Sequence, residues 1–574
     1  MARSRLMHAF VRAARILRSA REHGIPATEL AGIEAEARRL SRRQFAMGAT
    51  YVGTLAATAG VGVGAAACSS SGGTGDGADA STKGTGNVIV VGGGIAGVHA
   101  TYRLAKAGVD VTLYDAQKTL GGRIQTDRTT FPDGMHCEIG GELIDTGHTT
   151  MHALATEFGI PLYDYSKDDD DALESVVGFF DGELVTEATL LTEFAPVAAK
   201  IDEALKVLQV KDDGVSRENA NGGAALDAMS IKQWLDAAAV SGRIRKLLEV
   251  AFVIEFGLDV EESNALNLLL MISTDTKKLA LFGESDELFH TKTGNATFVE
   301  KLVAGIEPAR IALEHELVAL KKASDGRYTA TFKSGASTKD VTATHVVLAL
   351  PFSILRNVAV DVGLPAPQAD AIQKLGYGAN AKLMTGWKSR PWRTKVGTRN
   401  GSNGEVFTDL AFQSTWETSR AQPGASGIVT NFTGGKSAVA LGTGTPETHR
   451  DAFVDQWDKV FPGSKAESNG KVVLANWPGH PFVKGSYSAY KVGQYTSICG
   501  VEGLRHENVL FCGEHTSSEA QGFMEGGAAT GLAVAEELIA EWKGESPDAG
   551  SETKSVVLAR AARIDRRALF GLRF

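Results

Sequence analysis

The segment that decides the fold is NVIVVGGGIAGVHATYRLAKAGVDVTLYDA, residues 87–116. Its continuous apolar run at Val88–Val91 is typical of a strand that is buried on both faces of a parallel sheet. The pattern then predicts a helix around Val98–Ala107 and a second strand at Val109–Tyr114. Because strand, helix and strand in this order form a βαβ unit, we expect an α/β protein built on a parallel sheet.

A glycine-rich turn joins the first strand to the helix. Residues 92–97, GGGIAG, fit the pattern G-x-G-x-x-G. The first glycine of this pattern permits a tight turn, the second lets the backbone approach a pyrophosphate, and the third lets helix and strand pack closely. Asp115 ends the second strand, where a carboxylate can accept hydrogen bonds from a ribose hydroxyl. The segment therefore predicts a bound dinucleotide, NAD or FAD, with these contacts: Gly92, Gly94, Ile95, Ala96, Gly97, Asp115 and Ala116.

The composition excludes several other classes of protein. The chain has 574 residues, enough for more than one domain, and its 43% hydrophobic and 22% charged residues are typical of a folded globular protein. Its formal net charge of −9 argues against a nucleic-acid-binding protein, which would usually carry a basic domain. Four cysteines are too few for a disulfide scaffold. The sequence contains neither a CxxC nor an HExxH spacing, either of which would indicate a zinc site. We therefore expect no metal.

The N-terminal residues 1–68 have the features of an export signal. Residues 1–45 hold ten arginines against four glutamates, and Arg42-Arg43 precede an uncharged, weakly apolar stretch that ends at Cys68. This pattern predicts a twin-arginine signal and an exported protein in the periplasm, in the cell envelope or outside the cell. A basic helix followed by a linker is the alternative. Cys68 ends a sequence that resembles a lipobox, so either it is lipidated or the signal is cleaved without a lipid, and residues 69–86 form a flexible linker.

Further motifs follow downstream in order. They are LGGR at residues 120–123, EIGG at 138–141, VVLALP at 346–351, GEHT at 513–516 and GFMEGG at 522–527. With the first segment, they resemble the monoamine oxidase family of flavin-containing amine oxidases over about residues 86–542. A second glycine pair followed by an arginine is foreign to simple NAD enzymes, so the resemblance implies FAD as the cofactor.

The resemblance implies a two-domain α/β fold with a discontinuous FAD-binding domain. That domain would comprise residues 87–160, 290–350 and 486–545. The substrate domain, a mixed sheet with helices, would comprise residues 161–289 and 351–485. A basic tail, residues 546–574, is expected to be a frayed, solvated helix.

More FAD contacts follow from the resemblance. Glu514 and the pair Met524-Glu525 match the family's clamp on the flavin ribityl chain and pyrimidine. The helix N-terminus that starts at Met524 would stabilise negative charge at the flavin N1–C2=O locus. As alternatives, Glu514 would be a surface carboxylate and Glu525 a helix cap. The residues implied are Gly122, Arg123, Gly140, Gly141, Glu142, Leu317, Glu514, Met524 and Glu525.

Four residues are candidates for the reaction itself. Lys382 lies in an otherwise apolar strand, where a charge is costly to bury. The family places a lysine there, bonded through a water to flavin N5, whereas an edge lysine with an exposed head is the alternative. The resemblance places Trp477 beside the flavin and makes Tyr487 and Phe523 the walls of an aromatic cage. Such a cage attracts an ammonium group and guides the neutral amine, and core packing is the alternative for each ring.

Four positions are compared with the branches of the family. Ser486 stands where mammalian monoamine oxidases carry a cysteine bonded to the flavin, so we expect non-covalent FAD. Leu143 stands where L-amino-acid oxidases carry an arginine for the substrate carboxylate, and Phe523 replaces the usual tyrosine. Asp145 lies where polyamine oxidases carry an acid, which would hold a distal ammonium or cap a loop.

The sequence thus predicts FAD-dependent oxidation of an amine C–N bond to an imine, which then hydrolyses. Oxygen, giving hydrogen peroxide, or an electron carrier would reoxidise the flavin. An L-amino-acid oxidase or a desaturase of the same fold is the first alternative, and an envelope flavoprotein without turnover is the second. The expected partners are a small amine, the electron acceptor and the twin-arginine export machinery. No nucleic acid is expected, a membrane is contacted only through the signal or a lipid on Cys68, and the oligomeric state is left open.

Overall fold

The computed structural model of the chain describes residues 86–167, 173–209, 214–283, 285–395 and 400–544. The predicted export signal, Cys68, nearly all of the predicted linker and the predicted basic tail lie outside these residues. The described residues all belong to one unit, Ala80–Phe574. Within it, two parts each have their own main sheet and hydrophobic core, as expected for the two-domain α/β fold.

A five-stranded parallel sheet carries the glycine-rich turn, and its strand order is β20-β13-β1-β2-β9. β1 (Val88–Val91) is central, between β13 (His345–Leu348) and β2 (Val111–Tyr114). β20 (Val509–Phe511) and β9 (Ile311–Ala312) form the two edges. All of β1 is buried, which explains its continuous apolar run. The strands come from separate stretches of the chain, so this part of the fold is discontinuous in sequence.

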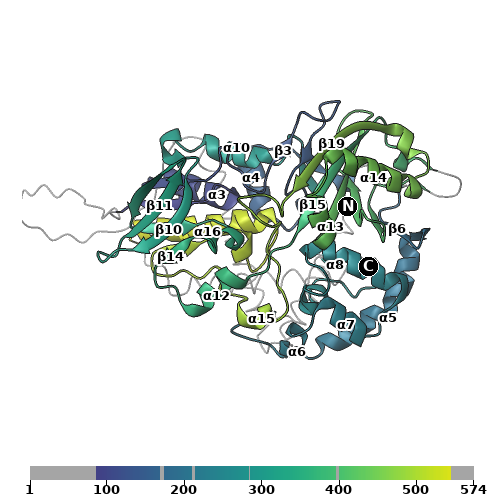
Figure 1. The fold of residues 1–574 in the computed structure, drawn as a ribbon, viewed down its shortest axis with the longest axis horizontal. Coiled ribbons are helices and arrows are strands. Elements are labelled where there is room, and N and C mark those ends of the chain that lie inside the picture. The colour runs from purple at the N-terminus through teal and green to yellow at the C-terminus, as the bar shows by residue number, and fades with distance from the viewer. Residues whose placement is uncertain (1–85, 168–172, 210–213, 284, 396–399, 545–574) are drawn as a thin grey trace, which may run out of the picture. The chain divides into compact units, whose positions relative to one another are not determined.

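Helices cover one face of this sheet, and a second sheet covers the other. α3 (Ile95–Lys106), α16 (Met524–Trp542) and α10 (Ala296–Ala304) share a core with two residues of β1, and α16 lies along α3 (Figure 1). The other two residues of β1 share a core with a four-stranded sheet of order β12-β11-β10-β14. Its strands are β10 (Glu316–Lys322), β11 (Tyr328–Ser334), β12 (Ser337–Ala343) and β14 (Ala359–Asp361).

The domain boundary predicted at residue 350 falls too early. β14 pairs in parallel with β10, so the chain after β13 stays with the first part. Phe352 and Ile372 also share one core with Ile89 of β1. α11 (Phe352–Leu355) and α12 (Ala366–Lys374) therefore belong to the FAD-binding side, and the chain enters the second part only at β15. The three residues of β14 are too few to show a strand pattern, so the sequence did not mark the later boundary.

The second part is built on a seven-stranded mixed sheet of order β19-β15-β18-β17-β16-β6-β7. On β16, the neighbours Val406 and Phe407 point to opposite faces, as side chains alternate along a strand. Val406 shares a core with Trp387 and Trp457, whereas Phe407 shares a core with the helices that pack on the other face of the sheet. The strands are β6 (Val177–Phe180), β7 (Glu183–Thr186), β15 (Asn380–Trp387), β16 (Val406–Thr408), β17 (Ser414–Glu417), β18 (Gly427–Gly434) and β19 (Ser468–Asn476).

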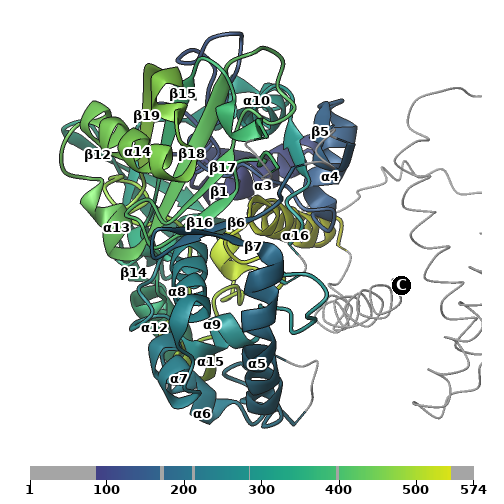
Figure 2. The same cartoon turned by 90° about the vertical axis from the view of Figure 1, so that its right-hand side faces the viewer.

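The helical layer lies below this sheet in Figure 2, and α8 contacts β16, β17 and β18. Its helices are α5 (Glu187–Leu205), α6 (Ala224–Asp227), α7 (Ile231–Ala237), α8 (Gly242–Phe256) and α9 (Ala265–Leu269). The remaining elements are β3 (Thr126–Asp127), β4 (Cys137–Glu138), α4 (Thr149–Glu157), β5 (Leu162–Asp164), β8 (Phe289–Thr291), α13 (Gly435–Ala440), α14 (Pro446–Val460) and α15 (Gln494–Ser497). Within the described ranges, no helix combines the length and the apolar character needed to span a bilayer.

Candidate active site

The glycine-rich turn after β1 has the geometry of a dinucleotide cradle. Gly92 has a φ of 109°, a conformation that side chains rarely adopt. A Cβ on Gly97 would lie 1.9 Å from the carbonyl oxygen of Gly92, so helix and strand meet there at backbone distance. A Cβ on Gly94 would meet no atom within 4 Å, so space remains beside its backbone for a ligand. These three glycines therefore fit the roles that the G-x-G-x-x-G pattern predicts.

Asp115 lies at the end of β2, beside this turn. Its carboxylate accepts hydrogen bonds from the backbone N–H groups of Gly93, at 2.6 Å, and Gln117, at 2.7 Å. Burial raises the pKa of Asp115 above its ordinary value, and the two N–H groups oppose this effect. Ile95 and Ala96 open α3, and Ala116 directly follows Asp115, so the predicted contacts of this segment lie together.

Arg123 links distant parts of the cofactor side. Its Nη1 donates to the backbone oxygen of Ser486 and to Oε1 of Glu514, both at 2.8 Å. Glu514 also accepts from the hydroxyl of Ser488 at 2.7 Å and from the N–H of Gly522 at 2.9 Å. Burial alone would raise the pKa of Glu514, but Arg123 and its other partners outweigh burial and hold the pKa below its ordinary value. Glu514 is thus an ionised internal anchor and not a surface carboxylate.

The glycine pair at residues 140–141 meets two other predicted residues. A Cβ on Gly141 would lie 2.6 Å from Cγ of Met524, and one on Gly140 would lie 3.2 Å from the Trp477 ring. The indole N–H of Trp477 donates to the backbone oxygen of Ile139 at 3.1 Å. The structure therefore brings together segments near residues 140, 477 and 524. By contrast, Leu317 lies in the core of the first part, beside an irregularity of β10.

Glu525 caps a neighbouring helix. Its carboxylate oxygens accept from the backbone N–H groups of Thr150 and Met151, each at 2.9 Å, in the first turn of α4. The side chain predicted to contact FAD is therefore engaged as a helix cap, which was the alternative. α16 itself starts without a side-chain cap at Phe523, so its N-terminal N–H groups remain available to an anionic or carbonyl group of the cofactor.

Lys382 is buried in β15 and has no exposed head. Its Nζ donates to the backbone oxygens of Gly140, at 2.7 Å, and Glu138, at 3.3 Å, and to Oε2 of Glu142 at 2.8 Å. It also lies 5.2 Å from the ring centre of Trp416. The edge-lysine alternative is therefore excluded. All three ammonium protons have protein acceptors, which differs from the expected bond to a water.

The predicted cage residues lie on neighbouring segments. The hydroxyl of Tyr487 donates to the backbone oxygen of Glu255 at 2.6 Å, which fixes its ring. A Cβ on Gly522, the residue before Phe523, would lie 3.5 Å from the Tyr487 ring. The Phe523 ring packs edge to face against His148, with centroids 5.2 Å apart. Ser486, which precedes Tyr487, has no thiol for the flavin.

Comparisons with known proteins decide the family. Residues 95–539 match the family described as flavin containing amine oxidoreductase. The chain belongs to this family. Polyamine oxidase 4 of Oryza sativa subsp. japonica is 23% identical over 484 residues, which cover 79% of this chain and 88% of the relative. L-amino-acid oxidase of Siganus canaliculatus is 21% identical over 444 residues, 75% of this chain and 81% of the relative. The solved structure of wild-type putrescine oxidase bound to putrescine has a TM-score of 0.66 at 18% identity, covering 79% of this chain and 99% of that one.

As a flavin amine oxidoreductase, the protein is an FAD-dependent enzyme that oxidises amines. The residues present fit this cofactor. The turn at Gly92–Gly97 and Asp115 would hold its adenosine diphosphate half, and Arg123 and the start of α16 would hold the flavin half. FAD supplies the redox chemistry, and the chain orients the amine and sets the charges around it.

Sequence reasoning missed several polar residues of this flavin amine oxidoreductase. Trp416 donates its indole N–H to Glu142 at 2.9 Å. Asn295 stands at the N-cap position of α10, yet its side chain donates to the backbone oxygens of Gly141 and Glu142. No local pattern marks either residue, because the partners of both come from distant segments.

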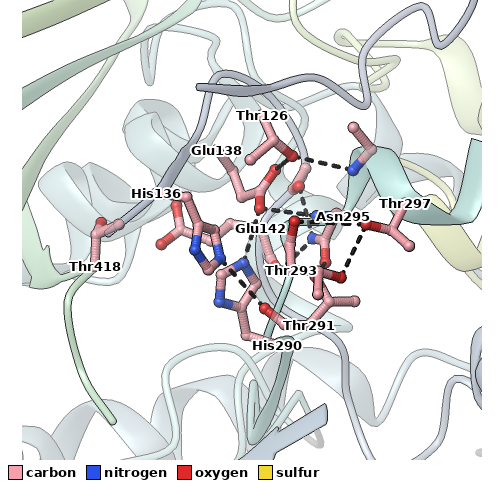
Figure 3. Close-up of polar contacts among 12 residues, drawn as sticks. Thr126, His136, Glu138, Glu142, His290, Thr291, Thr293, Asn295, Thr297 and Thr418 are labelled. Atoms are coloured by element: carbon pink, nitrogen blue, oxygen red, sulfur yellow. Dashed lines mark hydrogen bonds and ion pairs between the residues drawn. The ribbon is translucent and has the colours of Figure 1, made fainter. Parts of the chain in front are cut away.

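A buried cluster supports β4, just before the glycine pair. The nearest side-chain ligand atoms of His136, Glu138 and His290 lie within 4.8 Å of one another (Figure 3). Each already has a protein partner. Nε2 of His290 lies 2.9 Å from Glu138, Nε2 of His136 lies 3.3 Å from the Thr291 oxygen, and Thr126 donates to Glu138 at 2.7 Å. We interpret the cluster as a hydrogen-bonded support and not as a metal site.

Proposed function

We propose that the enzyme oxidises an amine that carries a second positive charge at its distal end. The observation that carries the proposal is a group of acidic side chains near the cage residue Tyr487. Glu255 contributes the backbone oxygen that holds the Tyr487 hydroxyl. Burial, with Asp145, raises the pKa of Glu255 to about 7, so this carboxyl is partly protonated at neutral pH in the free enzyme.

Glu287 is the second member of this group. Desolvation, followed by the effects of carboxylates that include Glu255 and Asp145, raises its pKa well above the ordinary value. Its φ of 47° is unusual for a residue other than glycine and is a strained conformation of the kind that clusters at functional sites.

Asp145 holds this segment in place. Its carboxylate accepts from the Ser285 hydroxyl at 2.8 Å and from the backbone N–H of Glu287 at 2.9 Å. Asp145 thus anchors a loop, which was one of its two expected roles. A distal ammonium would relieve the repulsion between Glu255 and Glu287, because an opposite charge favours the ionised form of a carboxyl. The polyamine oxidase and putrescine oxidase relatives are in keeping with such a substrate.

The test compares 1,4-diaminobutane with butylamine, which lacks the second amino group. We expect Glu287→Gln to raise KM for the diamine about tenfold or more, as for loss of a charge-assisted hydrogen bond, and to leave butylamine unaffected. Glu203→Gln, an exposed glutamate on α5, is the control and should change neither value. Equal changes for both amines, or no change for the diamine, would show that the acidic group does not select a second charge.

A further inference from the structure

An ion pair joins Glu142 to the candidate catalytic lysine, Lys382. Glu142 and Lys382 form an ion pair at 2.8 Å, and their side chains are only 4% and 7% exposed. Trp416 donates its indole N–H to the other carboxylate oxygen at 2.9 Å. Burial alone would raise the pKa of Glu142, but Lys382 and the hydrogen bonds outweigh burial and keep its pKa below the ordinary value. Glu142 is therefore ionised, and it forms an ion pair with Lys382.

The pair is fixed from the backbone as well. Asn295 donates to the backbone oxygen of Glu142 at 2.7 Å (Figure 3) and to that of Gly141 at 3.0 Å. Lys382 also donates hydrogen bonds to the backbone oxygens of Gly140 and Glu138. Lys382 thus has no ammonium proton left over, and the pair as a whole carries no net charge.

We propose that Glu142 is a positioning residue that holds Lys382 and cancels its charge beside the flavin, so that reduced FAD reacts slowly with oxygen. The proposal rests on the placement of Lys382 near flavin N5, which the family resemblance implies. When oxygen is the acceptor, it takes two electrons and one proton from the anionic reduced flavin and one proton from solvent, which gives hydrogen peroxide and oxidised FAD. The first electron creates negative charge on oxygen, which a net positive group stabilises. A neutral ion pair does not supply this stabilisation.

The test uses a variant that removes the negative charge of Glu142 and keeps the shape of its side chain. Wild type and Glu142→Gln are loaded with FAD, reduced with dithionite without oxygen, and mixed with oxygen in a stopped-flow instrument. Removing a single preorganised group commonly changes rates by about 10²–10³, so we expect reoxidation of the variant to be at least about tenfold faster. Dithionite replaces the amine, so this result does not depend on the proposed substrate.

A second readout needs no turnover. Sulfite adds to N5 of oxidised flavin and leaves a negative charge on the ring, and its affinity follows from the loss of flavin absorbance. We expect Glu142→Gln to bind sulfite about tenfold more tightly, for the same electrostatic reason. If this variant loses FAD, Glu142→Ser removes the same charge with a smaller side chain and is expected to change both readouts in the same direction.

Glu417 offers a matched control for Glu142. It lies on β17, in the same seven-stranded sheet as Lys382. It is buried and accepts from the indole N–H of Trp392 at 2.7 Å and from Arg393 at 2.6 Å, so its surroundings imitate those of Glu142. Glu417→Gln should change neither readout by more than about threefold, far less than the loss of a charge at the reacting centre. The double variant with Lys382→Met and Glu142→Gln should lose both the faster reoxidation and the tighter sulfite binding of Glu142→Gln, because the cation of Lys382 is gone. Reoxidation of Glu142→Gln no faster than wild type, or a double variant as fast as Glu142→Gln, would overturn the proposal.

Discussion

Ser486 shows how one residue sets the way in which the cofactor is held. Its hydroxyl donates to Oδ1 of Asn380 at 2.5 Å, and its backbone oxygen accepts from Arg123 at 2.8 Å. The residue therefore keeps its place between the cofactor side and β15 but has no sulfur with which to bond the flavin. The cysteines within the described ranges are Cys137, Cys499 and Cys512, and burial raises the pKa of each thiol.

We predict that acid precipitation releases all of the flavin. A non-covalent cofactor leaves with the unfolding of its site, whereas a thioether would keep it on the chain. The measurement is the flavin absorbance of the supernatant and of the washed pellet. Yellow colour retained in the pellet after repeated washing would reveal a covalent bond at a residue other than Ser486.

Lys382 shows what could and could not be predicted at this scale. A lysine inside an apolar stretch signalled a special role, and the structure places it in a fully buried strand as expected. Its acceptor Glu142 lies 240 residues away along the chain, so no local pattern pairs the two. The acidic group near Tyr487 was missed for the same reason, since Glu255 lies in the last turn of α8 and Glu287 lies in a loop that Asp145 shapes.

At the scale of elements, helices and strands with a strong apolar pattern were predicted correctly from the sequence. The βαβ unit at residues 88–114 lies where the apolar patterns placed it, within a few residues, and a helix begins at Met524, as the resemblance implied. The patterns did not reveal that β14 joins β10, because a three-residue strand has too little pattern to detect. Nor did they show that α16 stabilises α4 through Glu525, since this contact joins residues 375 positions apart.

We predict that Glu525→Ala lowers the free energy of unfolding of the apoprotein by about 1–2 kcal/mol, the usual cost of losing a helix cap. Glu525→Gln keeps one acceptor oxygen and should lose less. Urea denaturation measures this change, and FAD titration of the same variants measures cofactor affinity. Glu536→Ala, an exposed position on α16, is the control. Unchanged apoprotein stability together with weaker FAD binding would instead place the Glu525 carboxylate at the cofactor.

At the scale of the whole molecule, charge and the N-terminal sequence bear on where and on what the enzyme acts. The net charge of −9 attracts cationic amines over long range and opposes binding to anionic polymers. Export remains a prediction, since Arg42 and Arg43 lie outside the described residues. A twin-arginine signal would carry the protein across the membrane already folded, with FAD bound where the chain is made.

We predict that changing Arg42 and Arg43 together to lysine leaves active, FAD-loaded precursor in the cytoplasm. Cell fractionation with an activity stain in each fraction measures this. The control is the same pair of substitutions at Arg38 and Arg39, which also lie in the basic arm. Undiminished export of the Arg42/Arg43 variant would remove the twin-arginine interpretation.

Anaerobic titration of the flavin tests the central claim most directly. With oxygen absent, about one equivalent of 1,4-diaminobutane should bleach the FAD absorbance, since one C–N oxidation delivers the two electrons that one flavin accepts. Ornithine, which adds an α-carboxylate to the same diamine, should reduce the flavin at least about tenfold more slowly, because acidic side chains near the cage disfavour a buried anion. The account is contradicted if dithionite bleaches the flavin but amines do not. Faster reduction by ornithine than by the diamine would instead identify an amino-acid oxidase.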